Sequence, residues 1–294
     1  AIYILIGFYL GIQKTNLSSL MIIFFSSINI IFSSLLVLTY DLNIFGVVLG
    51  TLIASYLTAI GFLFFTYKFI IKSFQIFPKF DGFNAPLKIL KLLQINFDIF
   101  IRTLFLTFSF LWITYMGAKL GEDYLAVNAI LMQFIIIASF FLDSYAYTTE
   151  GIVGYAIGKR NKKAFLLAVN NSIQLGFFTS IIISIIYLLF FKNLINIITD
   201  IEILKFISYK HFLWILIIPP AASFCYLLDG IYIGASQTTE FRNCMIFSVI
   251  IFIIISIYLT KFLGNHGLWF SLFIFMILRA LSLRYYLNRI LKKF

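Results

Sequence analysis

One carboxylate, Asp229, lies in an otherwise apolar segment of the sequence, between Cys225 and the polar run that ends at Arg242. Apolar runs of membrane length flank this segment on both sides. A charge at that depth costs about 2.5–3.5 kcal/mol on insertion scales, so it is rarely there without a partner or a task. Two interpretations are open: a helix-end residue that reaches the lipid headgroups, or a carboxylate that handles a cation in a transporter.

Five further ionisable residues fall inside or at the rim of apolar segments, and they are Asp98, Arg102, Asp143, Glu150 and Arg279. Asp98 and Arg102 are four residues apart, which places them on one face of a helix. This spacing predicts a structural ion pair, and a coupling site is the alternative for Asp98.

Asp143 and Glu150 are seven residues apart, so they also share a helix face. Glu150 is close to the basic loop Lys159–Lys163, where a solvated carboxylate paired with a cation is an equally good interpretation. Asp143 lies deeper in its apolar segment. Because burial disfavours the charged form, such a carboxyl can exchange a proton near neutral pH. Asp229, Asp143, Asp98 and Glu150 are therefore candidates for cation coupling.

Other chemistries find little support in the sequence. The two cysteines, Cys225 and Cys244, and the two histidines, His211 and His266, have no zinc-site spacing, and no catalytic constellation is present. We therefore expect no enzyme, no metal site and no cofactor other than a coupling ion. The net charge of +11 comes from cations that lie between apolar runs, which argues for a lipid bilayer and against nucleic acid.

The composition sets the fold class. Hydrophobic residues make up 62% of the 294 and charged residues 11%, whereas a soluble domain has about 25% charged residues. Solid Ile/Leu/Phe blocks, rather than alternation, exclude a β-barrel and predict an all-α polytopic membrane protein. With about 20 apolar residues per span, we predict a partial span at 1–12 and complete spans at 17–40, 46–68, 94–117, 124–149, 164–191, 212–235, 244–262 and 267–286.

The lysines and arginines between these spans predict the orientation. They favour one side of the membrane by roughly three to one, which makes segment 69–93 and the C-terminus cytoplasmic. The turn Gly264–Gly267 is then external. The external segment 192–210 has an apolar spacing at Ile195, Ile198, Ile201 and Leu204 that predicts a short amphipathic helix at the interface.

Two backbone features stand out within the predicted spans. Pro219 and Pro220 interrupt the helix that holds Asp229, and proline removes a backbone donor. A gating kink and a packing kink are both open interpretations. Gly151, Gly154 and Gly158 permit close approach of a neighbouring helix.

An internal repeat predicts the domain organisation. FYLGIQKT at 8–15 aligns with IYIGASQT at 231–238, and both stretches lead into a long apolar helix. Copies that enter the membrane in the same direction imply an even number of helices per unit, hence a parent of six plus six helices. Because the match is short, chance similarity between two apolar segments is the alternative. The sequence begins without methionine inside an apolar run, so we expect a fragment. Residues 1–72 would end the first lobe, 73–93 form a cytoplasmic linker, and 94–294 form the second lobe.

Three motifs, FFLDSYAYTTEGIVGYAIGKRN at 140–161, CYLLDGIYIGASQTTEFRN at 225–243 and LGNHGLWFSLFIFMILRALSL at 263–283, carry a resemblance to a known family. They resemble the DinF (DNA-damage-inducible protein F) branch of the multidrug and toxic compound extrusion (MATE) transporters. The resemblance implies two six-helix lobes that export small organic compounds by proton or sodium antiport through alternating access. It also implies a multi-pass protein of the bacterial inner membrane that works as a monomer.

Family site residues carry over in part. The family often has Asn-x-x-x-Asp on helix 5 and a threonine on helix 6, and here Asn29 and Thr51 match. Ser33 stands where that aspartate would be, which puts cation binding in this lobe in doubt. In the second lobe, acidic residues on helices 7 and 10 are implicated in some members, and Asp98 and Asp229 lie on those helices.

Two alternatives to a cation-coupled exporter remain. A flippase for lipid-linked saccharides keeps the fold but favours several cations in its cavity to meet a pyrophosphate. Only Arg102 and Arg279 are candidates for that role. A non-transporting membrane subunit would need no alternating access and no buried carboxylates.

Overall fold

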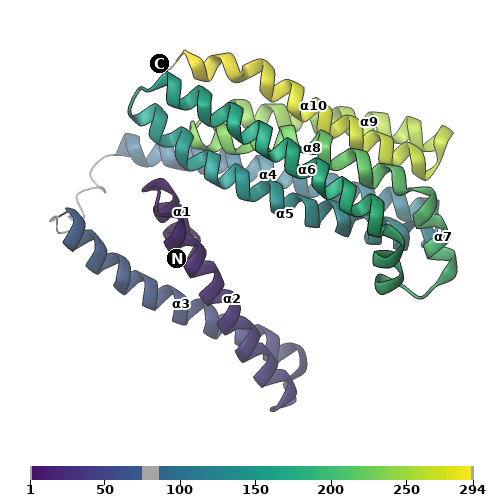
Figure 1. The fold of residues 1–294 in the computed structure, drawn as a ribbon, viewed down its shortest axis with the longest axis horizontal. Helices are drawn as coiled ribbons and strands as arrows, with labels where there is room; N and C mark the ends of the chain where they lie inside the picture. The colour runs from purple at the N-terminus through teal and green to yellow at the C-terminus, as the bar shows by residue number, and fades with distance from the viewer. Residues whose placement is uncertain (1, 75–85, 293–294) are drawn as a thin grey trace. The chain divides into compact units, whose positions relative to one another are not determined.

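The computed structural model describes residues 2–74 and 86–292, with side chains for 2–69 and 89–292 (Figure 1). Within these residues the chain is entirely α-helical. Eight helices are long and apolar enough to cross a membrane, which confirms the predicted all-α polytopic class. The helices are α1 (Ile2–Gly11), α2 (Thr15–Leu38), α3 (Asn43–Phe74), α4 (Pro86–Leu120), α5 (Glu122–Gly158), α6 (Lys162–Ile198), α7 (Glu202–Lys210), α8 (Phe212–Gly234), α9 (Thr238–Leu263) and α10 (Asn265–Leu291).

The chain divides into two compact units, Ala1–Pro86 and Leu87–Phe294. In the first unit, α2 and α3 pack against each other on either side of the turn Thr39–Leu42, and α1 packs on both. Tyr9 of α1 and Thr66 of α3 form a buried hydrogen bond of 2.6 Å between their hydroxyls. The α2–α3 contact is close because Gly50 lies against the backbone of Ser33.

The helix ends differ from the predicted spans on both sides of the predicted linker. α3 continues to Phe74 and α4 begins at Pro86, so both helices extend into the region predicted as polar connection. Proline is tolerated at the first position of a helix, because the amide hydrogen that it lacks would have no partner there. The predicted linker residues Pro78, Asp81 and Gly82 lie outside the described residues.

The amphipathic helix predicted around 195–204 lies further along the chain. α6 continues to Ile198, and α7 forms only from Glu202 to Lys210, with Leu204 and Ser208 buried. Glu202 in its first turn and Lys210 in its last turn complement the helix dipole.

α8 lies at the centre of the second unit and packs closely against α5, α6 and α10, while α9 packs on α10 (Figure 1). Glycines allow these approaches. The backbone of α8 at Gly230 and Gly234 meets the backbone of α5 at Ala146 and Glu150. Without a hydrophobic force between helices in lipid, such close backbone contact is a main source of association.

α8 continues without interruption through Pro219 and Pro220, although each proline leaves a carbonyl without its helical donor. The carbonyl four residues before Pro220 belongs to Leu216. Ser184 of α6 donates its hydroxyl to this carbonyl at 2.8 Å. A side chain from a neighbouring helix therefore replaces the donor that Pro220 lacks.

Candidate functional site

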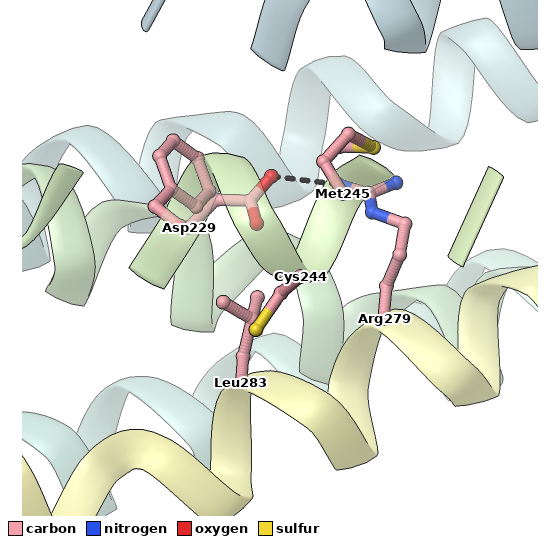
Figure 2. Close-up of a pocket in the computed structure, with 6 residues that line it drawn as sticks. Asp229, Cys244, Met245, Arg279 and Leu283 are labelled. Atoms are coloured by element: carbon pink, nitrogen blue, oxygen red, sulfur yellow. Dashed lines mark hydrogen bonds and ion pairs between the residues drawn. The ribbon is translucent and has the colours of Figure 1, made fainter. Parts of the chain in front are cut away.

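Asp229 is buried at the centre of the second unit and is bound by two arginines from different helices. Arg279 of α10 donates to its Oδ2 at 2.7 Å, and Arg102 of α4 donates to the same oxygen. Figure 2 shows the Asp229 carboxylate and the Arg279 guanidinium pointing toward each other. Arg279 is 1% exposed. The sequence identified all three residues but did not connect them.

Aromatic rings surround both guanidiniums. Arg102 lies 4.7 Å from the centre of the Phe241 ring, and Arg279 lies 5.5 Å from Phe275 and 5.7 Å from Tyr226. Such cation–π contacts return part of the hydration that a buried guanidinium loses. The recess beside the ion pair is lined by Asp229, Phe241, Cys244, Met245, Arg279 and Leu283 (Figure 2), and it has no room for a water molecule.

The cluster is not fully satisfied. Asp229 Oδ1, Arg102 Nε and Arg279 Nε are buried without a hydrogen-bond partner among the described residues. A buried polar atom left unpaired costs about 1–3 kcal/mol, more when it is charged. A purely structural ion pair would not need to bear this cost. The cluster is therefore the strongest candidate for a functional site in this unit.

Asp143 of α5 extends the cluster. It is half-buried and interacts electrostatically with Asp229, Arg102 and Arg279. Across the described part of the chain, no cation lies within ion-pair distance of its carboxylate. Two aspartates and two arginines thus form a group with no net charge when all four are ionised, and Asp143 is the member without a directly bonded partner.

Glu150 lies on α5 seven residues after Asp143, and it is outside this group. Its backbone contacts Gly234 of α8. Residues 89–292 contain no ion pair between Glu150 and the basic loop Lys159–Lys163. The rim pairing that the sequence suggested as one alternative is therefore absent from these residues, and cation coupling by Glu150 stays a prediction.

The predicted ion pair between Asp98 and Arg102 is not formed. Asp98 is buried and accepts from the hydroxyls of Thr238 and Thr239, each at 2.9 Å, and from Arg242 at 2.5 Å. These three donors belong to the first turns of α9, where the helix dipole also favours a negative charge. Arg102 forms its ion pair with Asp229 instead. The spacing along α4 was correct for a pair, but stronger partners lie on other helices.

Polar side chains attach α4 to the rest of its unit. Within the second unit, its backbone approaches no other helix as closely as α8 approaches α5 or α10. Asp98 and Arg102 bridge the distance, and Trp112 donates its indole N–H to Ser256 of α9 at 2.8 Å. An open hollow of about 370 Å³ lies along the exposed face of α4, next to Phe100, Thr103, Leu104, Thr107, Phe108 and Leu111. Sequence reasoning did not identify this hollow.

In the first unit the structure brings together the residues that the family pattern selected. Asn29 Oδ1 accepts from Ser33 Oγ at 2.9 Å and from Thr51 Oγ1 at 3.4 Å. All three groups are uncharged, so this cluster supplies oxygen atoms but no negative charge. Cation binding here would need an anionic ligand from another residue, and it stays a prediction.

Two histidines that look isolated in the sequence lie together in the structure. The rings of His211, between α7 and α8, and His266, in the first turn of α10, stack with their centres 4.2 Å apart. They are 55 positions apart in the chain, and no spacing in the sequence signals the contact. One layer deeper, Asn128 of α5 exchanges two hydrogen bonds with Asn265 of α10, at 2.8 and 2.9 Å.

The sequence is similar to known proteins over almost its whole length. A family model described as MatE matches residues 99–260. The chain is 32% identical over 287 residues to the DNA damage-inducible protein F of Escherichia coli K12, covering 95% of this chain and 61% of that protein. It is 23% identical over 277 residues to Protein DETOXIFICATION 43 of Arabidopsis thaliana, covering 94% and 51%. The chain thus spans between half and two thirds of the length of these relatives.

Solved structures share the fold. A mutant of the Vibrio cholerae MATE transporter VcmN matches with a TM-score of 0.87 and 17% identity, covering 99% of this chain and 66% of that one. The outward-facing conformation of a multidrug resistance MATE family transporter of the MOP superfamily matches with a TM-score of 0.86 and 18% identity, covering 98% and 65%. At these identities the similarity concerns the fold alone, and it confirms the predicted architecture.

Proposed function

This chain belongs to the MatE family of membrane transporters, and from that premise we propose that the complete protein exports small organic compounds in exchange for a proton or a sodium ion. It would do so by alternating access, as a monomer in the bacterial inner membrane with its C-terminus in the cytoplasm. The observation that supports this proposal most directly is the buried, incompletely satisfied charge cluster around Asp229.

Within the cluster we assign different roles to the two aspartates. Asp229 is held by Arg102 and Arg279, so it serves as a fixed counter-charge. Asp143 has electrostatic contact with the same three groups but no bonded cation, so it is the residue that can receive the coupling ion. Asp98 already accepts three hydrogen bonds, which leaves it little capacity for exchange.

Neutralising Asp143 would change the balance of the whole cluster. With both aspartates ionised, the four charges cancel. With a proton or sodium ion on Asp143, the remaining group of Asp229, Arg102 and Arg279 has a net charge of +1. The repulsion acts on Arg102 and Arg279, and Arg102 belongs to α4, whose backbone is the least closely packed in the unit. Ion binding would thereby favour a different position of α4, which is the coupling that an antiporter requires.

The two alternatives gain no support. A lipid-linked saccharide flippase needs cations that are free to meet a pyrophosphate, yet Arg102 and Arg279 are both bound to Asp229. A non-transporting membrane subunit gives no reason to bury two aspartates with two arginines, because ion pairs of this kind are seldom better than apolar packing.

Substitution of Asp143 tests the assigned role in the complete protein. We expect Asp143→Asn to lower gradient-driven efflux by roughly tenfold or more, which corresponds to about 1.4 kcal/mol of lost coupling, while membrane insertion stays near normal. The measurement is efflux of a fluorescent organic cation from proteoliposomes under an imposed pH or sodium gradient. Glu150→Gln, on the same helix but outside the cluster, is the matched comparison: efflux close to that of the wild type assigns the coupling to Asp143, and a loss equal to that of Asp143→Asn gives Glu150 a share in it.

The outcomes separate the general proposal from the residue assignment. Wild-type efflux that ignores both gradients would refute antiport altogether. If gradient-driven efflux is unchanged in Asp143→Asn, the protein is an antiporter but Asp143 does not bind the coupling ion.

The proposed orientation has its own test. Single cysteines at Lys261, in the last turn of α9, and at Lys162, at the start of α6, should react with a membrane-impermeant maleimide on opposite sides of the membrane. We expect labelling of position 261 from outside and of position 162 only after the cytoplasmic face is opened. The native Cys225 and Cys244 are buried, so their background labelling should be low. The reverse pattern would contradict the orientation.

A further inference from the structure

The histidine stack joins three helices at one end of the second unit. The His211 and His266 rings are nearly parallel, with 16° between their planes, and Tyr124 in the first turn of α5 meets the His211 ring edge-on at 6.3 Å. His211 is 3% exposed, whereas His266 is exposed to the surroundings. Because Tyr124 lies at the start of α5 and the basic loop Lys159–Lys163 follows its end, the stack is at the opposite end of α5 from that loop.

The hydrogen-bond partners determine where each neutral ring holds its proton. His211 Nδ1 lies 2.8 Å from the carbonyl oxygen of Ile207, which can only accept, so Nδ1 holds the hydrogen and Nε2 is bare. The indole N–H of Trp214 can only donate, and it points to His266 Nδ1 at 3.1 Å. His266 Nδ1 is therefore the bare nitrogen in that ring.

We propose that this histidine pair is a pH-sensitive latch, which holds the start of α8 against the start of α10 while both rings are neutral and opens when either ring gains a proton.

Neither unprotonated nitrogen can gain a proton unless the groups around it move. His211 Nε2 is buried and has no partner among the described residues, so a proton there would be an unsatisfied donor on a buried cation. A proton on His266 Nδ1 would face the indole N–H of Trp214, which would set two donors against each other. In both cases the charged ring also lies against the other histidine.

The charges around His211 give the direction of the response. Burial lowers the pKa of His211 below its ordinary value, and the charge of Lys210, together with that of His266 whenever its ring is protonated, lowers it further, while the hydrogen bond to Ile207 opposes them. From the other packed helices, α5 contributes the uncharged Tyr124 and α8 the uncharged Trp214. The closed latch therefore binds protons less readily than an open one. The free energy that favours the closed latch has its full value above about pH 6.5, the ordinary pKa of histidine, and decreases as the pH falls below that value.

Neighbouring contacts limit how far the opening extends. Asn128, Asn265 and Trp269 hold α10 to α5 by hydrogen bonds that do not depend on pH in this range. The start of α8 has further contacts near the latch: the ring of Phe212 lies 4.5 Å from Phe191 of α6, and the ring of Trp214 stacks on Phe270 of α10 at 5.8 Å. Acidification on the latch side should thus loosen α7 and the first turn of α8, and leave α10 in place.

Hydrogen exchange in the complete protein, reconstituted in lipid nanodiscs, tests the latch. Exchange is measured at pH 7.5, 6.5 and 5.5 and corrected for the intrinsic rates. We expect protection of residues 207–214 to fall by roughly tenfold between pH 7.5 and 5.5, while protection of residues 265–272 stays constant; tenfold corresponds to a shift of one pKa unit.

Two variants make the test specific. In His211→Asn/His266→Asn, each asparagine can place a donor or an acceptor near the former Nδ1, so the double variant should stay protected at pH 5.5. His266→Lys keeps a positive charge at every pH and should show the acid behaviour at pH 7.5. The latch is refuted by constant wild-type protection at 207–214, by an acid response in the double variant equal to that of the wild type, or by full protection in His266→Lys at pH 7.5.

Discussion

Asparagine at position 229 is expected to destabilise the second unit by about 3–5 kcal/mol, the usual cost of removing one partner from a buried ion pair. The amide has nearly the volume of the carboxylate, so packing is preserved. Its effect is electrostatic: Arg102 and Arg279 lose their shared counter-charge in a site with no room for water. The measurement is thermal unfolding of the purified protein in detergent, followed by the loss of the monodisperse fraction.

Substitutions of the arginines supply the matched comparison for this prediction. Arg102→Met leaves Asp229 paired with Arg279, and Arg279→Met leaves it paired with Arg102, so each should cost less than Asp229→Asn. Of the two, Arg279→Met should cost more, because Arg279 is 1% exposed and also contacts Phe275 and Tyr226. An Asp229→Asn variant as stable as the wild type would show that the arginines do not depend on this carboxylate.

Alanine at position 230 is expected to destabilise the same unit by about 1–3 kcal/mol or more, the range for overpacking a close contact. A Cβ atom at Gly230 would overlap the carbonyl oxygen of Ala146, and neither backbone can turn aside as a side chain can. α5 and α8 would have to separate, and that displacement would reach Asp143 and Asp229 together. Thermal unfolding in detergent and gradient-driven efflux should both decline.

The control for Gly230→Ala is another glycine of the same helix pair. A Cβ atom at Gly158, near the end of α5, meets nothing within 4 Å. Gly158→Ala should be neutral or slightly stabilising, because alanine has the higher helix propensity. Equal stability of the two alanine variants would mean that the close α5–α8 contact contributes nothing.

The spans could be predicted from the sequence because the bilayer imposes a length of about 20 apolar residues, and a segment such as α6 meets it without any charge in its centre. The ends could not be predicted as well. Helices α3 and α4 continue through polar residues at the membrane surface, where hydropathy no longer distinguishes helix from connection.

The ion pairs show a different limit. Helix periodicity relates only residues within one helix, so it paired Asp98 with Arg102, four positions away. The structure pairs Arg102 with Asp229, 127 positions away, and Arg279 with Asp229, 50 positions away. The glycines follow the same pattern. Gly154, one of the three glycines expected to permit close approach, does face the backbone of α8 at Gly234, but the closer contacts between α5 and α8 are at Gly230 and Gly234 of α8.

The hydrogen bond that the Ser184 hydroxyl donates to the Leu216 carbonyl has a consequence for insertion into the membrane. In bulk lipid, α8 alone would leave the carbonyls before Pro219 and Pro220 unsolvated, at a cost of several kcal/mol each. α6 precedes α8 in the chain, so it leaves the ribosome first. We therefore expect insertion of α8 as an unbroken helix to depend on prior insertion of α6. The order of the two helices in the chain is the order that this dependence requires.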